Sequence, residues 1–142
     1  MSHANTLDYD LAKVLLVDDD PASRLTLKTV LEASGYAVDA AASAAEAVGK
    51  LEEGEYSLVL SELQMESPEA GLTVLAHARM MDYKPATALI TAYHNALPAP
   101  VNRRSSLLIK PEDVPGLLSK VADLISQRAT RRLHRELRLA GV

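Results

Sequence analysis

Charged and hydroxyl side chains stand at the ends of several short apolar runs in this sequence. Asp18 and Asp19 follow "KVLLV", Glu62 follows "YSLVLS", Thr91 follows "ATALI" and Lys110 follows "SSLLI". Carboxylate oxygens are hard ligands that suit Mg²⁺, which takes one or two carboxylates and keeps several waters. A lysine and a threonine beside them would neutralise and position a phosphoryl group. These residue types indicate metal-assisted phosphoryl chemistry, provided that the fold brings them together.

The apolar runs bring these residues together if they are neighbouring strands of one parallel sheet. The apolar periodicity predicts alternating elements, with strands at 13–18, 36–42, 56–65, 86–91 and 105–110, and helices at 20–35, 43–54, 72–82 and from 112 onward. Asp20 is expected to cap the first helix, and Ser43 with Glu46 predicts a capping box at the second. Such alternation implies a parallel sheet covered by helices on both faces, with its functional crevice at the carboxyl ends of the strands.

Composition narrows the class of protein. A chain of 142 residues, 48% of them hydrophobic, is long enough for one domain with its own core. The sequence has no Phe, Trp or Cys, so aliphatic side chains must fill the core, and disulfides and thiolate metal sites are excluded. No apolar run approaches the ~18 residues of a membrane span, and the N-terminus lacks the features of a signal peptide. We therefore expect a cytoplasmic protein without a membrane partner.

The basic residues are concentrated at the C-terminus. The whole chain has 15 Lys and Arg against 19 Asp and Glu, a net charge of −4. Residues 126–142 hold five arginines against Glu136 alone, a net +4, so the remainder carries 10 basic and 18 acidic residues, a net −8. An acidic body joined to a basic tail suggests two separate roles.

Four segments in order, "LLVDDD", "LVLSELQM", "LITAY" and "LLIKP", resemble the receiver domain of two-component response regulators. The resemblance covers about residues 12–126. It implies an α/β fold of the flavodoxin-like (CheY-like) type, with a five-stranded parallel sheet in the order 2-1-3-4-5. Residues 1–11 would then be an N-terminal arm, residues 12–126 the receiver-like domain, and residues 127–142 a basic helical tail.

The resemblance also implies a role for each residue at the strand ends. Asp18 and Asp19 would be the acids of a Mg²⁺ pocket, with Asp19 as the direct ligand, and the backbone carbonyl of Gln64 would be a third ligand. Thr91 would contact phosphoryl oxygens, and Lys110 would pair with the phosphoacceptor. Mg²⁺ is the only cofactor that the resemblance suggests.

Glu62 stands where the family has its phosphoaccepting aspartate. Its additional methylene moves the carboxylate outward by ~1.3–1.5 Å, and a misplacement of about 1 Å can cost on the order of 10²-fold in rate. Leu107 likewise replaces the aromatic switch residue expected three positions before Lys110. We therefore expect a degenerate, non-catalytic receiver, or pseudo-receiver, with a permanent negative charge at position 62. A substitution that arose by neutral drift and a selected imitation of the phosphorylated state both explain Glu62.

The expected function is phosphorylation-independent protein–protein signalling in a two-component (phosphorelay) pathway, with a histidine kinase or a downstream effector as partner. The alternative is a genuine phosphoryl-accepting receiver that uses Mg²⁺-dependent phosphotransfer at Glu62 or another site. A phosphatase of the Asp-x-Asp-x-Thr type is a weaker alternative. Asp18 and Asp20 fit its two acids, but Ala22 stands where that motif needs Thr or Val.

The tail carries an apolar stripe of its own. At 100° per residue, Leu133, Leu137 and Ala140 fall roughly 160° around the helix from the stripe that contains Leu117 and Val121. Either the helix bends near residue 128 to cover the body, or the stripe is left for a partner, such as a second copy in a homodimer. A solvated basic helix end, stabilised by the helix macrodipole, is the plain alternative. No module that reads nucleic acid fits in so few residues, so nucleic acid is not an expected partner.

Overall fold

Five parallel strands form one sheet in the order β2-β1-β3-β4-β5, which confirms the predicted flavodoxin-like, CheY-like fold. The computed structural model describes residues 12–90, 107–109 and 113–141. The strands are β1 (Lys13–Val17), β2 (Ala37–Ala41), β3 (Leu58–Glu62), β4 (Ala86–Ile90) and β5 (Leu107–Ile109). Each lies inside the segment that the apolar periodicity predicts.

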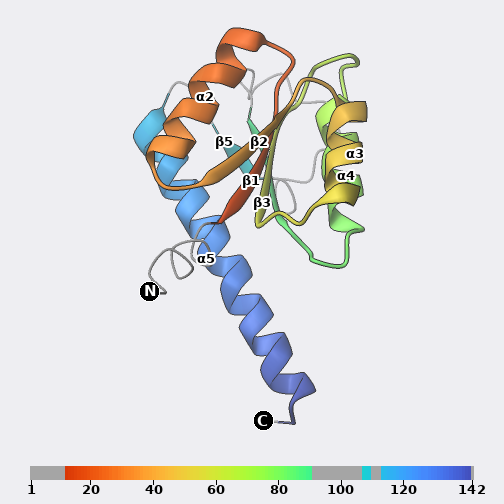
Figure 1. Ribbon diagram of the computed structural model, residues 1–142, viewed down its shortest axis with the longest axis vertical. Coiled ribbons are helices and arrows are strands. Elements are labelled where there is room, and N and C mark those ends of the chain that lie inside the picture. Colours follow the sequence, from red (N-terminus) through yellow and green to blue (C-terminus); the bar gives the residue numbers. More distant parts are fainter. Residues whose placement is uncertain (1–11, 91–106, 110–112, 142) are drawn as a thin grey trace, which may run out of the picture.

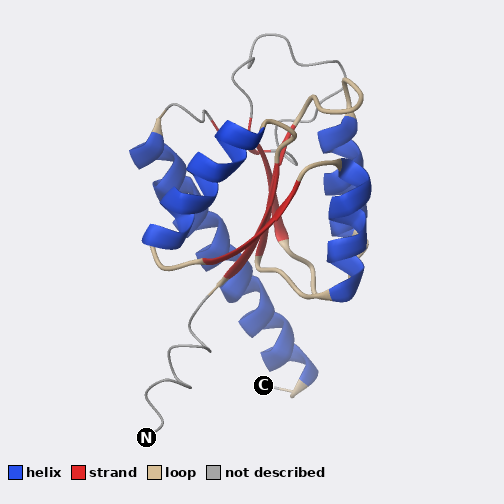
Figure 2. Cartoon of the chain, turned by 45° about the horizontal axis from the view of Figure 1, so that its top comes forward, coloured by secondary structure: helices blue, strands red, loops and turns tan. Residues whose placement is uncertain are grey.

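Helices cover both faces of the sheet (Figures 1 and 2). They are α2 (Pro21–Ala33), α3 (Ala44–Glu53), α4 (Ala70–Arg79) and α5 (Val114–Leu139). α2 and α5 lie on one face, and α3 and α4 lie on the other. The sheet is therefore the middle of three layers, as expected for a parallel sheet whose strands are buried on both sides.

Successive residues of β1, β3 and β4 contribute to the two faces in turn. In β1, Leu15 and Val17 pack against α3 and α4, whereas Val14 and Leu16 pack against α2 and α5. This alternation follows from the two-residue period of a strand. All four side chains are fully buried. Aliphatic packing on both faces thus holds the central strands in place relative to the helices.

Local capping contacts set where the helices begin. Asp20 accepts a hydrogen bond from the Ser23 amide at 3.3 Å and caps α2, as predicted. Ser43 accepts one from the Glu46 amide at 3.1 Å, which confirms the capping role predicted for it at α3. The Glu46 carboxylate turns back to accept from the Ala42 amide at 2.7 Å, one residue before the expected partner. These contacts satisfy amides that have no partner within their helices.

The prediction for α4 was wrong at both ends, because the helix spans Ala70–Arg79 rather than 72–82. It begins early because the Gly71 amide donates to the Leu63 carbonyl at 2.8 Å, which draws the first turn onto the end of β3. It ends early because the chain reverses before β4. Lys84 has a positive φ of 44°, and its ammonium donates to the Arg79 carbonyl at 2.9 Å.

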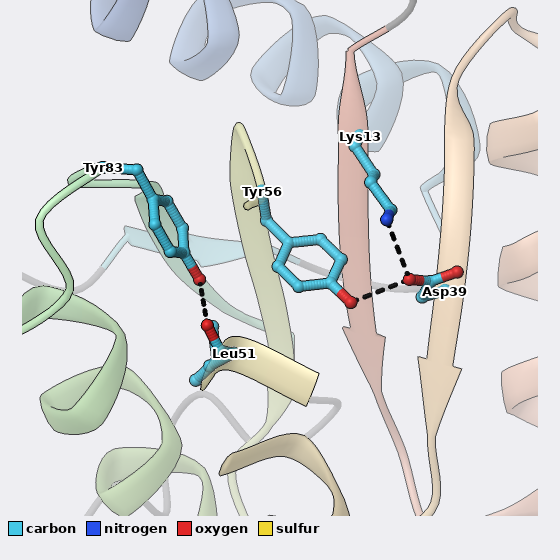
Figure 3. Close-up of polar contacts among 5 residues, drawn as sticks. All are labelled: Lys13, Asp39, Leu51, Tyr56 and Tyr83. Atoms are coloured by element: carbon cyan, nitrogen blue, oxygen red, sulfur yellow. Dashed lines mark hydrogen bonds and ion pairs between the residues drawn. The ribbon is translucent and has the colours of Figure 1, made fainter. Parts of the chain in front are cut away.

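A polar cluster links Lys13 at the start of β1, Asp39 in β2 and Tyr56 just before β3 (Figure 3). Tyr56 donates a hydrogen bond to the Asp39 carboxylate at 2.7 Å, and Lys13 pairs with the same carboxylate at 3.4 Å. The Lys13 ammonium also lies 5.1 Å from the centre of the Tyr56 ring. The Tyr56 hydroxyl, and then Lys13, lower the pKa of Asp39 below its ordinary value, against the opposing effect of burial. The cluster ties the strands together through one shared carboxylate.

Replacing Tyr56 by Phe is expected to lower the free energy of unfolding at neutral pH by about 1 kcal/mol, because a charge-assisted hydrogen bond is lost. A folded-state pKa of Asp39 below its unfolded value stabilises the fold above the unfolded pKa, and this contribution is lost as pH falls through the folded pKa. The difference between the two proteins should therefore shrink in acid. Urea denaturation followed by circular dichroism at neutral and acidic pH measures both effects.

Tyr36 provides a control for this substitution, because it is also a tyrosine just before a strand, is half-buried where Tyr56 is buried, and packs on the opposite face of the sheet. Tyr36→Phe should change the free energy of unfolding by less than about 0.5 kcal/mol at either pH. An equal loss in both variants, or a Tyr56→Phe effect that does not depend on pH, would contradict the role assigned to Asp39.

α5 runs without interruption from Val114 to Leu139, and its C-terminal half extends beyond the edge of the sheet (Figure 1). Leu133 and Leu137 remain 55% and 41% exposed. The alternative in which the helix bends near Arg128 to bury these leucines against the body is therefore wrong, and the stripe faces outward. No described helix is both long and apolar enough to span a membrane.

Candidate functional site

The strand register brings the predicted acidic residues to one edge of the sheet. Val17 pairs with Ser61 across β1 and β3, so Asp18 and Glu62 follow at the same level on neighbouring strands. Ile90 pairs with Glu62 and with Ile109, so β3, β4 and β5 are aligned at their carboxyl ends. A doubly wound sheet is expected to have its functional crevice at this edge.

Asp18 is held firmly at the end of β1. It is only 4% exposed, and its amide donates to the Ala41 carbonyl at 3.0 Å. Its carboxylate accepts a hydrogen bond from the Asp20 amide at 3.0 Å, and its carbonyl accepts one from the Arg24 guanidinium at 2.8 Å. Asp19, by contrast, is exposed to solvent. One predicted pocket acid is therefore fixed by the fold, and the next is available to an ion or a ligand.

Glu62 is the last residue of β3, as predicted, and its side chain is half-buried. One of its carboxylate oxygens accepts a hydrogen bond from the Leu63 amide at 3.0 Å. The neighbouring Ser61 is fully buried, and its hydroxyl donates to the Glu62 carbonyl at 2.9 Å. The backbone at position 62 is thus tied to the strand end, and the carboxylate is turned toward its own following amide.

The loop between β3 and α4 is anchored at both ends. The Glu66 carboxylate accepts hydrogen bonds from the Ala44 amide, at 2.9 Å and 3.2 Å to its two oxygens, so it binds the first turn of α3. Gly71 approaches the strand end so closely that a Cβ there would lie 2.2 Å from the Glu62 carbonyl oxygen. Gln64, whose carbonyl is the predicted metal ligand, is exposed and lies between the end of β3 and Glu66.

Two predicted site residues, Thr91 and Lys110, lie outside the described residues, and so does the side chain of Leu107. Their roles therefore remain predictions. The described backbone ends one residue before each of the first two, at Ile90 in β4 and Ile109 in β5, which pair with one another.

The donor set at this edge fits a hard divalent cation. Asp18, Asp19 and the Gln64 carbonyl offer oxygen ligands of the kind that Mg²⁺ prefers. Within the described ranges, no three His, Asp or Glu side chains are grouped closely enough to hold a metal ion on their own. Mg²⁺ does not require such a group, because it binds through one or two carboxylates and keeps water in its other positions.

Two residues of this region were not identified from the sequence. Arg24 lies in the first turn of α2 and reaches back to the Asp18 carbonyl. An arginine near a helix N-terminus opposes the macrodipole, and this local anomaly could have marked it. Glu66 contacts Ala44 across 22 residues of sequence, and no local pattern indicates such a contact.

Residues 14–122 match the protein family described as the response regulator receiver domain, and this range includes every predicted site residue. The transcriptional regulatory protein GlrR of Escherichia coli is 32% identical over 127 residues, which are 87% of this chain and 28% of GlrR. The gliding motility regulatory protein of Myxococcus xanthus is 33% identical over 96 residues, 67% of this chain and 12% of that protein. The chain thus spans well under half the length of these relatives.

Solved structures share the fold. The response regulator TrrA of Thermotoga maritima, determined in complex with Mg²⁺-BeF, is 28% identical with a TM-score of 0.70, covering 80% of this chain and 99% of TrrA. The receiver domain of the hybrid histidine kinase CckA is 27% identical with a TM-score of 0.66, covering 80% of this chain and 98% of that domain.

Proposed function

The chain belongs to the response regulator receiver family of two-component systems, and we propose that it signals through protein–protein contacts without phosphorylation at position 62. It would act as a binding module rather than as an enzyme. The partners that this proposal requires are a histidine kinase or a downstream effector protein. GlrR, named above as a transcriptional regulatory protein, favours a downstream effector as the partner, although GlrR is much longer than this chain.

The observation that carries the proposal is the identity and placement of Glu62. A phosphoacceptor must bring its oxygen to phosphorus in line while its neighbours hold the other phosphoryl oxygens. Glutamate reaches ~1.3–1.5 Å further than aspartate from the same backbone position, and that backbone is held by β3 and by the close approach of Gly71. Relaxation of the backbone to compensate is therefore restricted, and the nucleophilic oxygen would be misplaced.

A glutamate at this position supplies part of what a phosphoryl group would supply. It places one permanent negative charge at the edge of the sheet, where phosphorylation brings about −1.5 to −2 charges and three acceptor oxygens. One carboxylate oxygen already accepts from the Leu63 amide. We infer a fixed signalling state that resembles phosphorylation in charge but offers fewer acceptors to neighbouring groups.

Mg²⁺ remains compatible with this function. Asp18, Asp19 and the Gln64 carbonyl would hold it, and the bound cation would supply charge neutralisation beside Glu62. In this proposal the cation and its ligands balance the local charge and order the loop between β3 and α4, and no phosphoryl group is transferred. Pairing of two copies through Leu133 and Leu137 is a separate part of the proposal that rests on their exposure.

Incubation with acetyl phosphate and Mg²⁺ is expected to leave the protein without a covalent phosphate. Intact-mass spectrometry measures the result, and a phosphorylatable response regulator treated in parallel shows that the phosphodonor is active. A hydroxylamine-labile mass gain of one phosphate would contradict the proposal. It would favour the alternative, a genuine phosphoryl acceptor at Glu62 or at another site.

A further inference from the structure

The face of α5 that packs on the body continues as a row of arginines beyond the sheet. At 100° per residue, the side chains at 128, 131, 132, 135 and 138 all fall within about 70° of the stripe that Leu117, Val121 and Leu124 form against the sheet. Leu133 and Leu137 lie on the opposite side. By this spacing, the half of α5 that extends beyond the sheet has one basic face and one face with Leu133 and Leu137.

The basic face encloses a groove against the turn between α4 and β4. The cavity measures about 430 Å³. The described residues that line it, here called the basic groove, are Lys84, Arg128, Arg131, Arg132, His134, Arg135 and Arg138. A smaller cavity of about 260 Å³ adjoins it along Lys84, Arg132 and Arg135, and there Asp82 and Glu136 contribute two acids.

The base of the basic groove is rigid. Arg128 is only 8% exposed, and its guanidinium donates to the Lys84 carbonyl at 3.0 Å and to the Tyr83 carbonyl at 2.8 Å. Lys84 is fixed in turn, because its ammonium caps the C-terminus of α4 at Arg79. The hydrogen bonds of Arg128 thus join α5 to the turn before β4, and these two segments form the walls of the groove. The other arginines that line the groove lie further along α5.

The carboxylates near the groove, which belong to Asp82, Glu136 and Glu55, offset only part of its positive charge. Among the described residues, no arginine of α5 has a carboxylate oxygen within 4.0 Å. The pKa of Arg128 is lowered, first by burial and then by the positive charge of Arg132, against the opposing effect of the Glu55 carboxylate. Like charges held this close repel one another, and an anionic partner would relieve that repulsion.

We propose that the basic groove binds an acidic helical segment of a partner protein. The exposed arginines Arg131, Arg135 and Arg138 follow one another at spacings of four and three residues, a row about 10 Å long. A helix with glutamates at the same alternating spacing presents a matching row of carboxylates, and guanidinium groups bind carboxylates with directed hydrogen bonds. This inference is independent of what happens at Glu62.

The groove fits an acidic helix better than other anionic partners. Single-stranded nucleic acids bind largely by stacking on aromatic side chains, and the described residues of the basic groove include no Tyr, Phe or Trp. A membrane-surface helix buries its apolar face in the lipid. Here the apolar face is opposite the arginines, so a flat bilayer that binds Leu133 and Leu137 would leave the basic groove empty.

The test uses the full chain and a fluorescein-labelled helical peptide whose glutamates repeat at alternating three- and four-residue spacing. Fluorescence anisotropy should show saturable binding that weakens as salt is raised. The double variant Arg131→Glu/Arg135→Glu should weaken binding by about tenfold or more, because two pairings become repulsions. The control Lys28→Glu/Lys120→Glu makes the same change of charge outside the groove and should alter the affinity by less than about twofold.

Parallel measurements decide between the possible occupants. Equal affinity for a peptide of the same composition in scrambled order, or equal losses in the two double variants, would overturn the proposal. So would tighter binding to a DNA duplex or to vesicles of mixed neutral and anionic lipid. Self-association of the wild-type chain that Arg131→Glu/Arg135→Glu abolishes would assign the groove to a second copy. Circular dichroism confirms that the exposed substitutions leave the helix intact.

Discussion

The Glu62→Asp variant is expected to acquire at least about a hundredfold more hydroxylamine-labile phosphate than the wild-type protein when both are incubated with acetyl phosphate and Mg²⁺. The shorter side chain retracts the carboxylate by about one bond length from the position that Glu62 occupies. The aspartate carboxylate would also not occupy the position in which a Glu62 oxygen accepts a hydrogen bond from the Leu63 amide. Intact-mass spectrometry with and without hydroxylamine measures the outcome.

Wild-type protein and the Glu62→Asp variant carry the same charge at position 62, so their comparison tests the length of the side chain. Glu62→Asn has nearly the shape of the aspartate variant but carries no nucleophilic carboxylate, so it should remain unlabelled. Asp19→Asn in the Glu62→Asp background should reduce labelling, because Asp19 is the exposed acid of the predicted Mg²⁺ pocket. If Glu62→Asp stays as inert as the wild-type protein, side-chain length is not what prevents phosphorylation, and the explanation must lie elsewhere in the pocket.

The Gly71→Ala variant is expected to lose about 3 kcal/mol of the free energy of unfolding. A Cβ at position 71 would lie 2.2 Å from the Glu62 carbonyl oxygen and 2.7 Å from the Leu63 Cα, and neither backbone atom can rotate away as a side chain could. Either α4 or the end of β3 must therefore shift. Urea denaturation followed by circular dichroism measures the loss.

Gly49 is the matched control for this prediction. It lies within α3 with nothing within 4 Å of the position of an added Cβ. Gly49→Ala should therefore raise the free energy of unfolding by about 0.5–1 kcal/mol, because alanine favours a helix more than glycine does. A Gly71→Ala protein as stable as the wild type would mean that the contact between α4 and β3 is looser than the structure indicates. It would also weaken the argument that the backbone at Glu62 cannot relax.

Local patterns were sufficient to predict most elements of this fold. The apolar runs located all five strands, and the alternation of strands and helices implied a parallel sheet with helices on both faces. Asp20 and Ser43 were identified as helix caps because a cap acts within three residues of itself. The edge that carries Asp18 and Glu62 followed from the same pattern, since parallel strands end on the same side of a sheet.

Contacts between distant parts of the chain were decided only by the tertiary structure. The bond between Glu66 and Ala44, the shared carboxylate of Asp39 and the approach of Gly71 to β3 each join separate elements. The direction of α5 is of the same kind. The periodicity of α5 left open whether residues 133 and 137 turn back onto the body. In the structure, Arg128 is buried and binds the turn before β4, and the helix continues without a break, so these two residues stay outside.

The sequence alone determined that Asp18 and Glu62 stand at the same edge of the sheet, because the succession of strands along the chain and the length of each apolar run are local properties. It also determined the chemistry of position 62, since the length of a glutamate side chain does not depend on its surroundings. The tertiary structure decided how firmly that residue is held and which face of α5 meets the body. Those outcomes depend on packing between segments that the chain brings together only when it folds.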